Sequence, residues 1–433
     1  MIDINLLREN PQAVQKAAKD KGVEIDAEHI LELDNKHKKF LLEVQSIREE
    51  RNTLNESIKK NPNQWDKEGA QSLKQKLEEK EQQLNKVKED LDKLLWGIPN
   101  LPLKDVPVGD ASKFEIIRTI GEPKKFDFTP KDHLEIGESL DIIDVQRASK
   151  ISGTRFGFLK NQGALLEFAL INFALETLTK EGFVPVVPPA LIKKDITEKL
   201  GYWHGKLDEK HTANENYYLV YDPKEDSESL EMYLIGTAEH AIVPMHKDEV
   251  FNAKDLPKKY VGFSSSFRRE AGSYGKDTRG IFRVHQFDKV EMVEFVKEED
   301  DEKERGKMLS IVEELLQKLE LPYRVIKLAS QDLAFPTAET IDIEIWMPSQ
   351  NKYRETHSIS TTTDFQSRRL NIRYIKDQKS NIKEYVHILN GTAFAIGRTI
   401  IAILENNQNE DGSVDIPKVL QKYLNFKKIS KSS

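Results

Sequence analysis

Hydrophobic residues recur in alternating steps of three and four along two stretches near the start of the chain. A repeat of this kind places apolar side chains on one stripe of a helix. Asn61-Pro62-Asn63 separates the two stretches and favours a turn. We therefore predict an antiparallel coiled-coil hairpin over about residues 33–96, with helices of roughly 40 Å each. The stripe residues are Leu33, His37, Phe40, Val44, Ile47, Arg51, Leu54, Ile58, Ala70, Leu73, Leu77, Lys80, Leu84, Val87, Leu91 and Leu94.

The predicted hairpin is more cationic than the rest of the chain. Residues 33–98 carry 14 Lys and Arg side chains against 13 Asp and Glu side chains, whereas the whole chain has a formal net charge of -7. Basic side chains on an exposed helix surface are suited to RNA phosphates. A solvated coiled-coil surface or a protein–protein spacer explains the same composition. The candidate phosphate contacts are Lys36, Lys38, Lys39, Arg48, Lys59, Lys60, Lys74 and Lys76.

The segments that flank the hairpin suggest where the chain divides. Short helical pieces are predicted in residues 1–30, where Asn10-Pro11 marks a break or a helix start. Pro99 and Pro102 lie inside residues 96–107 and end the helical periodicity, so we interpret this segment as a linker. The sequence therefore predicts an N-terminal region, 1–104, and a larger C-terminal region, 105–433.

Residues 163–180 are apolar on nearly every side of a predicted helix, and the extended stretch FVPVVPP follows them. A helix that is apolar all round is buried in a core or in an interface between chains. Both alternatives remain open from the pattern alone.

The stretch 262–296 predicts two strands joined by a loop over 271–280, whose three glycines suit a connection. Side chains alternate along a strand, so Arg268 and Glu270 share one face of the first strand. The corresponding face of the second strand carries Arg283, His285, Phe287, Lys289 and Glu291. Guanidinium groups bind phosphates, an aromatic ring stacks on a purine and a carboxylate holds an amine. A solvated strand face of mixed charge explains the same pattern.

Three later segments carry further polar side chains. In LIGTAEHAIV, Thr237 and Glu239 have the same strand parity. Residues 341–345 alternate as a strand, and YRETHSIS follows them. Strict alternation would put Glu355 and Ser358 on opposite faces, so we expect a bulge or turn between them. Residues 387–390 predict a short strand, Gly391 a break, and 393–406 a helix.

Composition excludes several kinds of site. The chain has no cysteine, which rules out disulfides, thiol nucleophiles and cysteine-ligated zinc, and we expect no zinc. The net charge argues against a protein that coats nucleic acid through bulk positive charge. No apolar run approaches the roughly 20 residues that span a bilayer, and residues 1–10 lack the profile of a signal or transit peptide. We therefore expect a cytoplasmic protein with no membrane partner.

FRREAGSYGKDTRGIFRVHQFDKVEM resembles motif 2 of the class II aminoacyl-tRNA synthetases, in the form found in seryl-tRNA synthetases. Motif 2 here covers about 262–296, and the stretches 163–189 and 387–406 resemble motifs 1 and 3. IDINLLRENPQAV and the hairpin resemble the N-terminal domain of the same family. The resemblance implies an α+β fold: a class II antiparallel sheet flanked by helices, plus an N-terminal antiparallel coiled-coil arm. It also implies a homodimer formed through motif 1 and an arm that grips tRNA(Ser).

The resemblance implies that the chain activates L-serine with ATP to seryl-adenylate and transfers serine to the 3′ end of tRNA(Ser), with Mg²⁺ as cofactor. It leaves open whether tRNA(Sec) is a second acceptor. Matched residue by residue, it assigns catalytic roles to Arg268 and Arg398. The implied serine-binding residues are Thr237, Ala238, Glu239, Arg268, Glu291 and Thr392. The implied ATP-binding residues are Arg268, Arg269, Glu270, Arg283, Val284, Phe287, Glu355, Thr356, His357, Ser358 and Arg398. Mg²⁺ is assigned to Glu355 and Ser358, and an alternative for Thr392 is a helix N-cap.

Some positions depart from the usual family pattern. Arg269 stands where a small residue is usual, and His357 stands where serine is common. Residues 337–340, TAET, also differ from the usual motif. Two rival functions are a class II paralogue that loads an acceptor other than tRNA, and a catalytically inactive coiled-coil interaction protein. The arm argues against the first rival, and the intact charged set of the site argues against the second.

Overall fold

The computed structural model describes residues 1–60, 67–202, 216–220, 231–270, 279–377 and 382–431. The chain separates into two compact units, Met1–Leu101 and Pro102–Ser433. The predicted loop over 271–280 and the polar stretch 202–231 fall largely outside the described residues. Within the described part of the chain, no helix is both long enough and apolar enough to cross a membrane.

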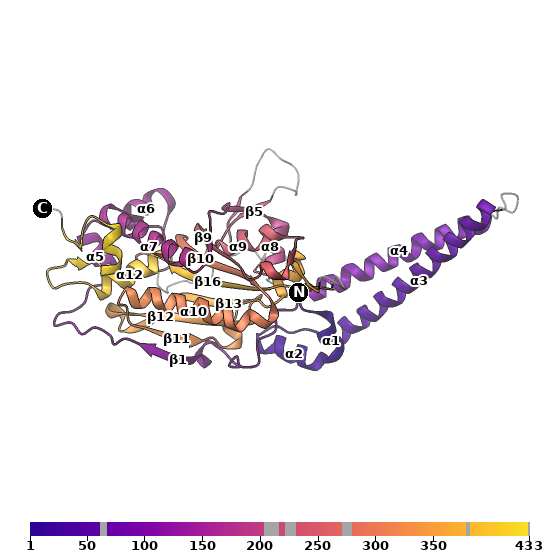
Figure 1. Ribbon diagram of the computed structural model, residues 1–433, viewed down its shortest axis with the longest axis horizontal. Helices are drawn as coiled ribbons and strands as arrows, with labels where there is room; N and C mark the ends of the chain where they lie inside the picture. The colour runs from indigo at the N-terminus through magenta and orange to yellow at the C-terminus, as the bar shows by residue number, and fades with distance from the viewer. Residues whose placement is uncertain (61–66, 203–215, 221–230, 271–278, 378–381, 432–433) are drawn as a thin grey trace. The chain divides into compact units, whose positions relative to one another are not determined.

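The first unit is helical (Figure 1). Asn10 caps α2: its side chain accepts a hydrogen bond from the N–H of Ala13 at 3.0 Å, and Pro11 is the first helical residue. The predicted helix start is therefore confirmed. The helices of this unit are α1 Ile4–Glu9, α2 Pro11–Asp20, α3 Ala27–Lys60 and α4 Lys67–Trp96.

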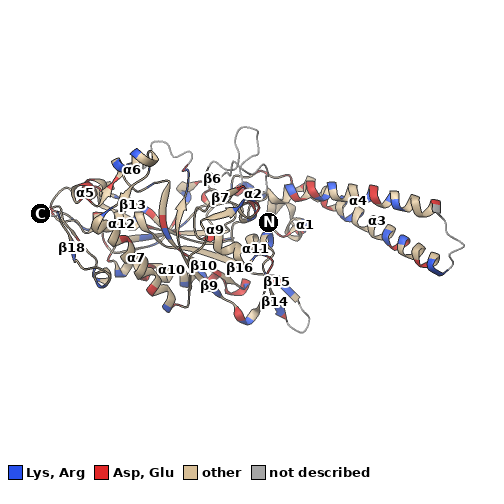
Figure 2. Ribbon diagram, turned by 90° about the horizontal axis from the view of Figure 1, so that it is seen from above, with Lys and Arg blue, Asp and Glu red and all other residues tan. Residues whose placement is uncertain are grey.

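Helices α3 and α4 form the predicted antiparallel hairpin (Figure 1). Val44, Ile47 and Leu77 are buried between them, and Leu73 and Leu84 pack against this cluster. Basic and acidic residues are interspersed along both helices (Figure 2). The hairpin is therefore held by a narrow apolar seam with a charged surface on its other sides.

Polar residues on the seam behave differently from one another. Lys80 Nζ lies 2.7 Å from Glu43 Oε2, so this cation is paired at the edge of the seam. Arg51 is exposed, and its placement among the core positions was wrong. Near the end of α4, Leu95 is 5% exposed and Leu94 is 37% exposed, so Leu95 takes the buried position expected for Leu94.

The second unit is built on an eight-stranded sheet with the order β1-β11-β12-β13-β16-β10-β9-β4. Neighbouring strands are antiparallel except for β4 and β9. This confirms the predicted antiparallel class of sheet. The strands are β1 Glu115–Ile120, β11 Tyr323–Lys327, β12 Glu339–Met347, β13 Lys352–Thr361, β16 His387–Ala395, β10 Gln286–Val296, β9 Lys258–Phe267 and β4 Val184–Val186.

The two faces of the sheet have different neighbours. Val290 and Met292 of β10 belong to the main core, together with residues of α7, α10 and α12. Val293 and Phe295 point the other way and pack in a second cluster with residues that include Ile242 of α9. Lys289 and Glu291 have the parity of Val293 and lie on the face opposite the main core, whereas Phe287, near the start of β10, packs against the main core.

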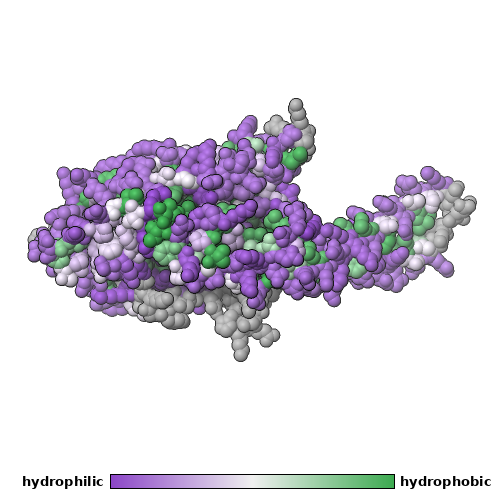
Figure 3. Space-filling model, turned by 90° about the horizontal axis from the view of Figure 1, so that it is seen from below, coloured by the Kyte–Doolittle hydropathy of each residue, from purple (hydrophilic) through white to green (hydrophobic). Residues whose placement is uncertain are grey.

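Shorter elements complete the second unit, and the face seen in Figure 3 is mostly hydrophilic with small hydrophobic patches. The helices are α5 His133–Ser139, α6 Val145–Ser152, α7 Asn161–Lys180, α8 Lys194–Leu200, α9 Glu239–Ile242, α10 Asp301–Lys318, α11 Phe365–Leu370 and α12 Ile396–Asn406. The remaining strands are β2 Ile143–Asp144, β3 Phe158–Leu159, β5 Leu191–Lys193, β6 Leu219–Val220, β7 Met232–Leu234, β8 Val250–Asn252, β14 Arg373–Asp377, β15 Ile382–Tyr385, β17 Val414–Asp415 and β18 Lys428–Ile429.

Several predicted boundaries were wrong. Thr237 and Glu239 are not on a strand, because α9 begins at Glu239. Gly391 does not break β16, which continues to Ala395 before α12 begins at Ile396. Thr392 therefore lies within a strand, and the N-cap alternative is excluded. The second strand of the 262–296 stretch begins at Gln286, later than expected.

The bulge expected between Glu355 and Ser358 is confirmed. In the ladder of β12 and β13, Ile343 pairs with His357 and the next residue, Glu344, pairs with Glu355. Thr356 is therefore the extra residue, and the alternation of side chains is reset at this point.

Candidate active site

Two cavities adjoin one another beside β10, β13 and β16. The first, here called the aromatic cavity, is lined by Phe282, Phe287 and Arg398 among others. The second, here called the polar cavity, has a volume of about 520 Å³ and is lined by Thr237, Glu239 and Glu291 among others. Six residues line both cavities and are here called the shared wall: Arg268, Glu270, Arg283, Lys289, Glu355 and Ser358.

Guanidinium groups lie against the rings of the aromatic cavity. Arg268 lies 5.4 Å from the centroid of the Phe287 ring. Arg398 lies 4.9 Å, and Arg354 4.2 Å, from the centroid of the Phe282 ring. These positions satisfy the geometry of cation–π contacts. The cavity thus combines flat apolar surfaces with strong phosphate donors.

Arg398 is fixed by three contacts at the start of α12. Its Nε donates to the carbonyl of Phe282 at 3.4 Å, and its Nη1 donates to the carbonyl of Glu355 at 3.0 Å. Nη1 also lies 3.2 Å from Glu355 Oε1. Desolvation favours the neutral form of Glu355, but Arg398 and Arg268 outweigh it and lower the pKa of this carboxyl.

Glu270 and Arg283 of the shared wall form an ion pair. Arg283 Nη1 lies 3.0 Å from Glu270 Oε2. Glu270 lies beyond the end of β9, with a φ of 51°, so its orientation comes from a turn and not from strand alternation. Arg268 Nε donates to the carbonyl of Gly236 at 3.1 Å, which anchors this side chain between the cavities.

Glu239 is a buried acid in the polar cavity, with 2% of its surface exposed. Tyr202 donates to both of its carboxyl oxygens, at 2.9 and 3.1 Å, and Gln366 Nε2 donates to Oε1 at 3.1 Å. Burial, and secondly the neighbouring Glu291, raise the pKa of Glu239 to about 7. A carboxyl in this position is suited to an ammonium group.

Lys289 connects two residues of the polar cavity. Its Nζ donates to Thr237 Oγ1 at 3.2 Å and forms an ion pair with Glu291. Glu291 lies opposite Thr392 in the ladder of β10 and β16. Thr392, however, lines the aromatic cavity and not the polar one. Because Lys289 pairs with Glu291, an ammonium ligand at Glu291 would compete with Lys289 for the carboxylate.

Oxygen donors gather where the two cavities meet. The bulge at Thr356 allows Glu355 and Ser358 to line the same space. Asp342 pairs across the sheet with Ser358, and its Oδ1 has no hydrogen-bond partner among the described residues. Burial, and then the charge of Glu355, raise the pKa of Asp342 well above its usual value. These hard donors are the ligands that Mg²⁺ prefers, and a cation would relieve their mutual repulsion. Within the described residues, no three His, Cys, Asp or Glu side chains form a metal-binding group.

Three of the predicted site residues do not line either cavity. Arg269 donates through its backbone N–H to the carbonyl of Asn216 at 2.9 Å. Ala238 is fully buried before α9. His357 is 1% exposed, its Nδ1 lies 2.7 Å from Thr356 Oγ1, and burial lowers its pKa to about 3. Binding roles for these three residues remain predictions.

Sequence reasoning missed the roles of several residues of the site. It placed Lys289 on the strand face of Phe287 and Glu291 but assigned it no role in binding. Asp342 lies in the alternating stretch of β12, but only the pairing with Ser358 identifies its role. No local signal points to Tyr202 or Gln366, because folding alone brings them to Glu239.

Comparisons with known proteins agree over the whole chain. Residues 1–102 match the family model of the seryl-tRNA synthetase N-terminal domain. Residues 218–407 match the tRNA synthetase class II core domain (G, H, P, S and T). The chain is 42% identical to the serine–tRNA ligase of Carboxydothermus hydrogenoformans, and the match covers 100% of both chains. It is also 42% identical to the serine–tRNA ligase of Thermodesulfovibrio yellowstonii, over 98% of this chain and 99% of the relative.

Two solved structures are similar along the full length. One is seryl-tRNA synthetase from Pyrococcus horikoshii complexed with ATP, with a TM-score of 0.89 and 38% identity over 100% of both chains. The other is the cytoplasmic serine–tRNA ligase from Naegleria fowleri in complex with AMP, with a TM-score of 0.86 and 29% identity. It covers 100% of this chain and 99% of the solved one.

Proposed function

Because the chain belongs to the seryl-tRNA synthetase family, we propose that the aromatic cavity holds ATP and the polar cavity holds serine. The chain activates serine with ATP and transfers it to tRNA.

One observation carries this assignment: the two cavities share six residues, three of which are cationic. Activation requires the serine carboxylate and the α-phosphate of ATP to meet in one place. Two anionic groups come together only where positive charge offsets their repulsion. The shared wall, with Arg268, Arg283 and Lys289, supplies that charge between a nucleotide on one side and an amino acid on the other.

ATP binding is assigned to the side chains of the aromatic cavity. Adenine stacks on Phe287 beside Val284, and Glu270 accepts a hydrogen bond from its amino group. Arg268 holds the α-phosphate and Arg398 the γ-phosphate, each through a planar guanidinium group. In the free protein Arg398 contacts Glu355, and the nucleotide takes over part of this contact.

Serine binding is assigned to the polar cavity. The carboxyls of Glu239 and Glu291 bind the ammonium group, and Thr237, which accepts a hydrogen bond from Lys289, contacts a remaining polar atom. Thr392 lines the aromatic cavity, so its contact with serine is proposed only from the family resemblance and from its position opposite Glu291 in the ladder. A site that hydrogen-bonds the serine hydroxyl rejects alanine, because alanine leaves buried polar groups without partners. Threonine is excluded by size, which is a weaker discrimination.

Neither reaction step requires a protein side chain as a base. An oxygen of the serine carboxylate attacks the α-phosphorus, the bond to the bridging oxygen breaks, and pyrophosphate leaves with the electron pair. A hydroxyl of the 3′-terminal ribose then attacks the acyl carbon, and the bond between that carbon and the phosphate oxygen breaks. AMP leaves with the electron pair, and its phosphate takes up the hydroxyl proton. Displacement of this kind depends on positioning and on charge stabilisation. Arg268 serves both needs because it faces both cavities.

Glu355, Ser358 and Asp342 have the donor chemistry to hold Mg²⁺ at the shared wall. When bound, the ion neutralises phosphate charge. The residues themselves orient the site: Glu355 also fixes Arg398, and Asp342 lies across the sheet from Ser358.

Two further partners are proposed. The exposed basic side chains of α3 and α4 bind the tRNA backbone, because they lie on a rigid hairpin with a charged surface. A second copy of the chain covers motif 1, because Leu165 and Phe168 of α7 are 47% and 59% exposed. Large apolar side chains that remain exposed on one helix favour an interface.

Pyrophosphate exchange with ATP across a panel of amino acids tests the substrate assignment. We expect exchange with serine only, followed by charging of the serine fraction of total tRNA. Charging of tRNA(Sec) transcript in the same assay tests the second acceptor. Exchange driven by another amino acid, or exchange without any charging of tRNA, would contradict the proposed function.

A further inference from the structure

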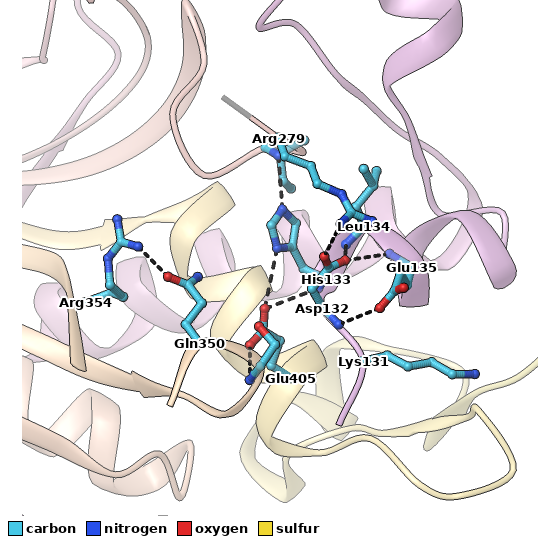
Figure 4. A network of polar contacts seen from close by, with 12 residues as sticks. Lys131, Asp132, His133, Leu134, Glu135, Arg279, Gln350, Arg354 and Glu405 are labelled. Atoms are coloured by element: carbon cyan, nitrogen blue, oxygen red, sulfur yellow. Dashed lines mark hydrogen bonds and ion pairs between the residues drawn. The ribbon is translucent and has the colours of Figure 1, made fainter. Parts of the chain in front are cut away.

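A buried histidine outside both cavities touches the end of the motif 2 segment (Figure 4). His133, the first residue of α5, is 5% exposed, and its Nε2 accepts a hydrogen bond from the backbone N–H of Ile281 at 3.2 Å. The preceding residue, Gly280, has a φ of 72°. A Cβ at Gly280 would lie 2.0 Å from His133 Nε2, so the imidazole occupies the space that any side chain there would need.

Glu405 of α12 holds this histidine in place. His133 Nδ1 lies 3.5 Å from Glu405 Oε1, and the backbone N–H of His133 donates to the same oxygen at 3.2 Å. The other carboxyl oxygen accepts from the N–H of Ser349 at 3.1 Å. Because Nε2 is an acceptor, the imidazole proton lies on Nδ1, which faces Glu405. Nδ1 makes no hydrogen bond within the described residues, so Glu405 holds the histidine through the backbone N–H of His133, which leaves Nε2 directed at Ile281.

The backbone at Ile281 leads directly into the aromatic cavity. The next residue, Phe282, offers its carbonyl to Arg398 Nε at 3.4 Å, and its ring supports the guanidinium at 4.9 Å. Arg283 follows and pairs with Glu270 at 3.0 Å. A displacement at Ile281 would therefore move Arg283 of the shared wall and the Phe282 surface on which Arg398 rests.

We propose that His133, held by Glu405, is a positioning residue for ATP. The proposal rests on the assignment of ATP to the aromatic cavity. His133 lines neither that cavity nor the polar one, so it acts through the backbone of Ile281. Serine binding at Glu239 and Glu291 depends on other contacts and is not part of this effect.

A second contact joins the same two segments but differs in strength. Arg279 Nη1 lies 3.0 Å from Asp132 Oδ2, and the arginine side chain is 63% exposed. An exposed ion pair is screened by solvent and contributes little. The buried hydrogen bond from the backbone N–H of Ile281 to His133 is therefore the contact that fixes the backbone position of Ile281.

The test compares three variants of the full chain. His133→Phe keeps a ring of similar size and removes the acceptor, whereas His133→Gln keeps an acceptor within reach of Ile281. Glu135→Ala is the control, because Glu135 belongs to the capping box of α5 and does not contact Ile281. The measurements are KM for ATP and for serine in pyrophosphate exchange, the dissociation constant for ATP by calorimetry, and the melting temperature.

We expect His133→Phe to raise KM and the dissociation constant for ATP by about tenfold, as the loss of one buried hydrogen bond predicts. KM for serine should stay near the wild-type value, His133→Gln should restore ATP binding, and Glu135→Ala should lower the melting temperature alone. Equal rises in both KM values, or a defect in His133→Gln as large as in His133→Phe, would overturn the positioning role. Normal ATP binding by His133→Phe would also overturn it. Pyrophosphate exchange by Arg268→Ala then separates the two proposals. Loss of exchange would support the assignment of ATP to the aromatic cavity, and normal exchange would contradict that assignment too.

Discussion

Arg398 holds Glu355 at two points: Nη1 donates to the backbone carbonyl at 3.0 Å and lies 3.2 Å from Oε1 of the same residue. The contact joins the start of α12 to β13 across the site. The carboxylate assigned to Mg²⁺ is thus kept charged by the arginine assigned to the γ-phosphate. Under the proposed assignments, this pair would couple metal binding to nucleotide binding.

Glu355→Gln should weaken the affinity for Mg²⁺ more than it destabilises the fold. The variant keeps the size of the side chain and loses a charged oxygen ligand, so the Mg²⁺ concentration for half-maximal pyrophosphate exchange should rise by at least about tenfold. Glu344→Gln is a matched control, because Glu344 is the cross-strand partner of Glu355 and lines neither cavity. An unchanged Mg²⁺ requirement in Glu355→Gln would contradict the metal assignment.

The affinity for serine should depend on pH through Glu239. Burial and Glu291 raise its pKa to about 7, so the carboxyl is mostly protonated below that pH. The serine ammonium group binds the charged form, which means that the proton must leave first. kcat/KM for serine should therefore fall about tenfold per pH unit below pH 7 and level off above it. Glu239→Gln should give a lower and flatter profile, and a flat wild-type profile would count against this role.

Assembly of the dimer should depend on the exposed apolar residues of motif 1. Phe168 is 59% exposed and Val187 is 85% exposed. Placing a charge at Phe168 should produce monomers, because the charge would have to be buried in the interface. Sedimentation velocity of Phe168→Lys is the measurement, and Val108→Lys, at a position 61% exposed outside motif 1, is the control. A dimer that persists in Phe168→Lys would exclude this surface.

Shortening the arm should separate the two reactions. Lys80 Nζ and Glu43 Oε2 are 2.7 Å apart, so α3 and α4 lie side by side there and a short turn can replace residues 44–79. Pyrophosphate exchange should stay near the wild-type rate. Charging of tRNA should fall by about a hundredfold or more, because the phosphate contacts of the distal arm are lost. Equal charging efficiency with the shortened arm would rule out its role in tRNA binding.

Periodicity predicted the parts of the molecule that depend on local pattern. The apolar stripe predicted the hairpin, because apolar residues recur at the seam positions along both long helices. Strand alternation placed Lys289 and Glu291 on one face. It also required the bulge that brings Glu355 and Ser358 together, and the register of β12 and β13 contains it.

Other features depend on contacts between distant segments. Gly391 looks like a strand break, yet β16 continues because the missing side chain makes room for Met308: a Cβ there would lie 2.9 Å from Met308 Cε. Tyr202 and Gln366 reach Glu239 from positions 37 and 127 residues away. No local pattern distinguishes such residues from ordinary core residues.

The central claim is that the shared wall contacts both substrates. Pyrophosphate exchange by Arg268→Ala tests this claim most directly. Arg268 lines both cavities, so its loss should reduce exchange by about a thousandfold while the melting temperature stays close to that of the wild type. Arg147→Ala, at a side chain 70% exposed on α6, should retain full exchange. Exchange by a folded Arg268→Ala protein at close to the wild-type rate would contradict the claim.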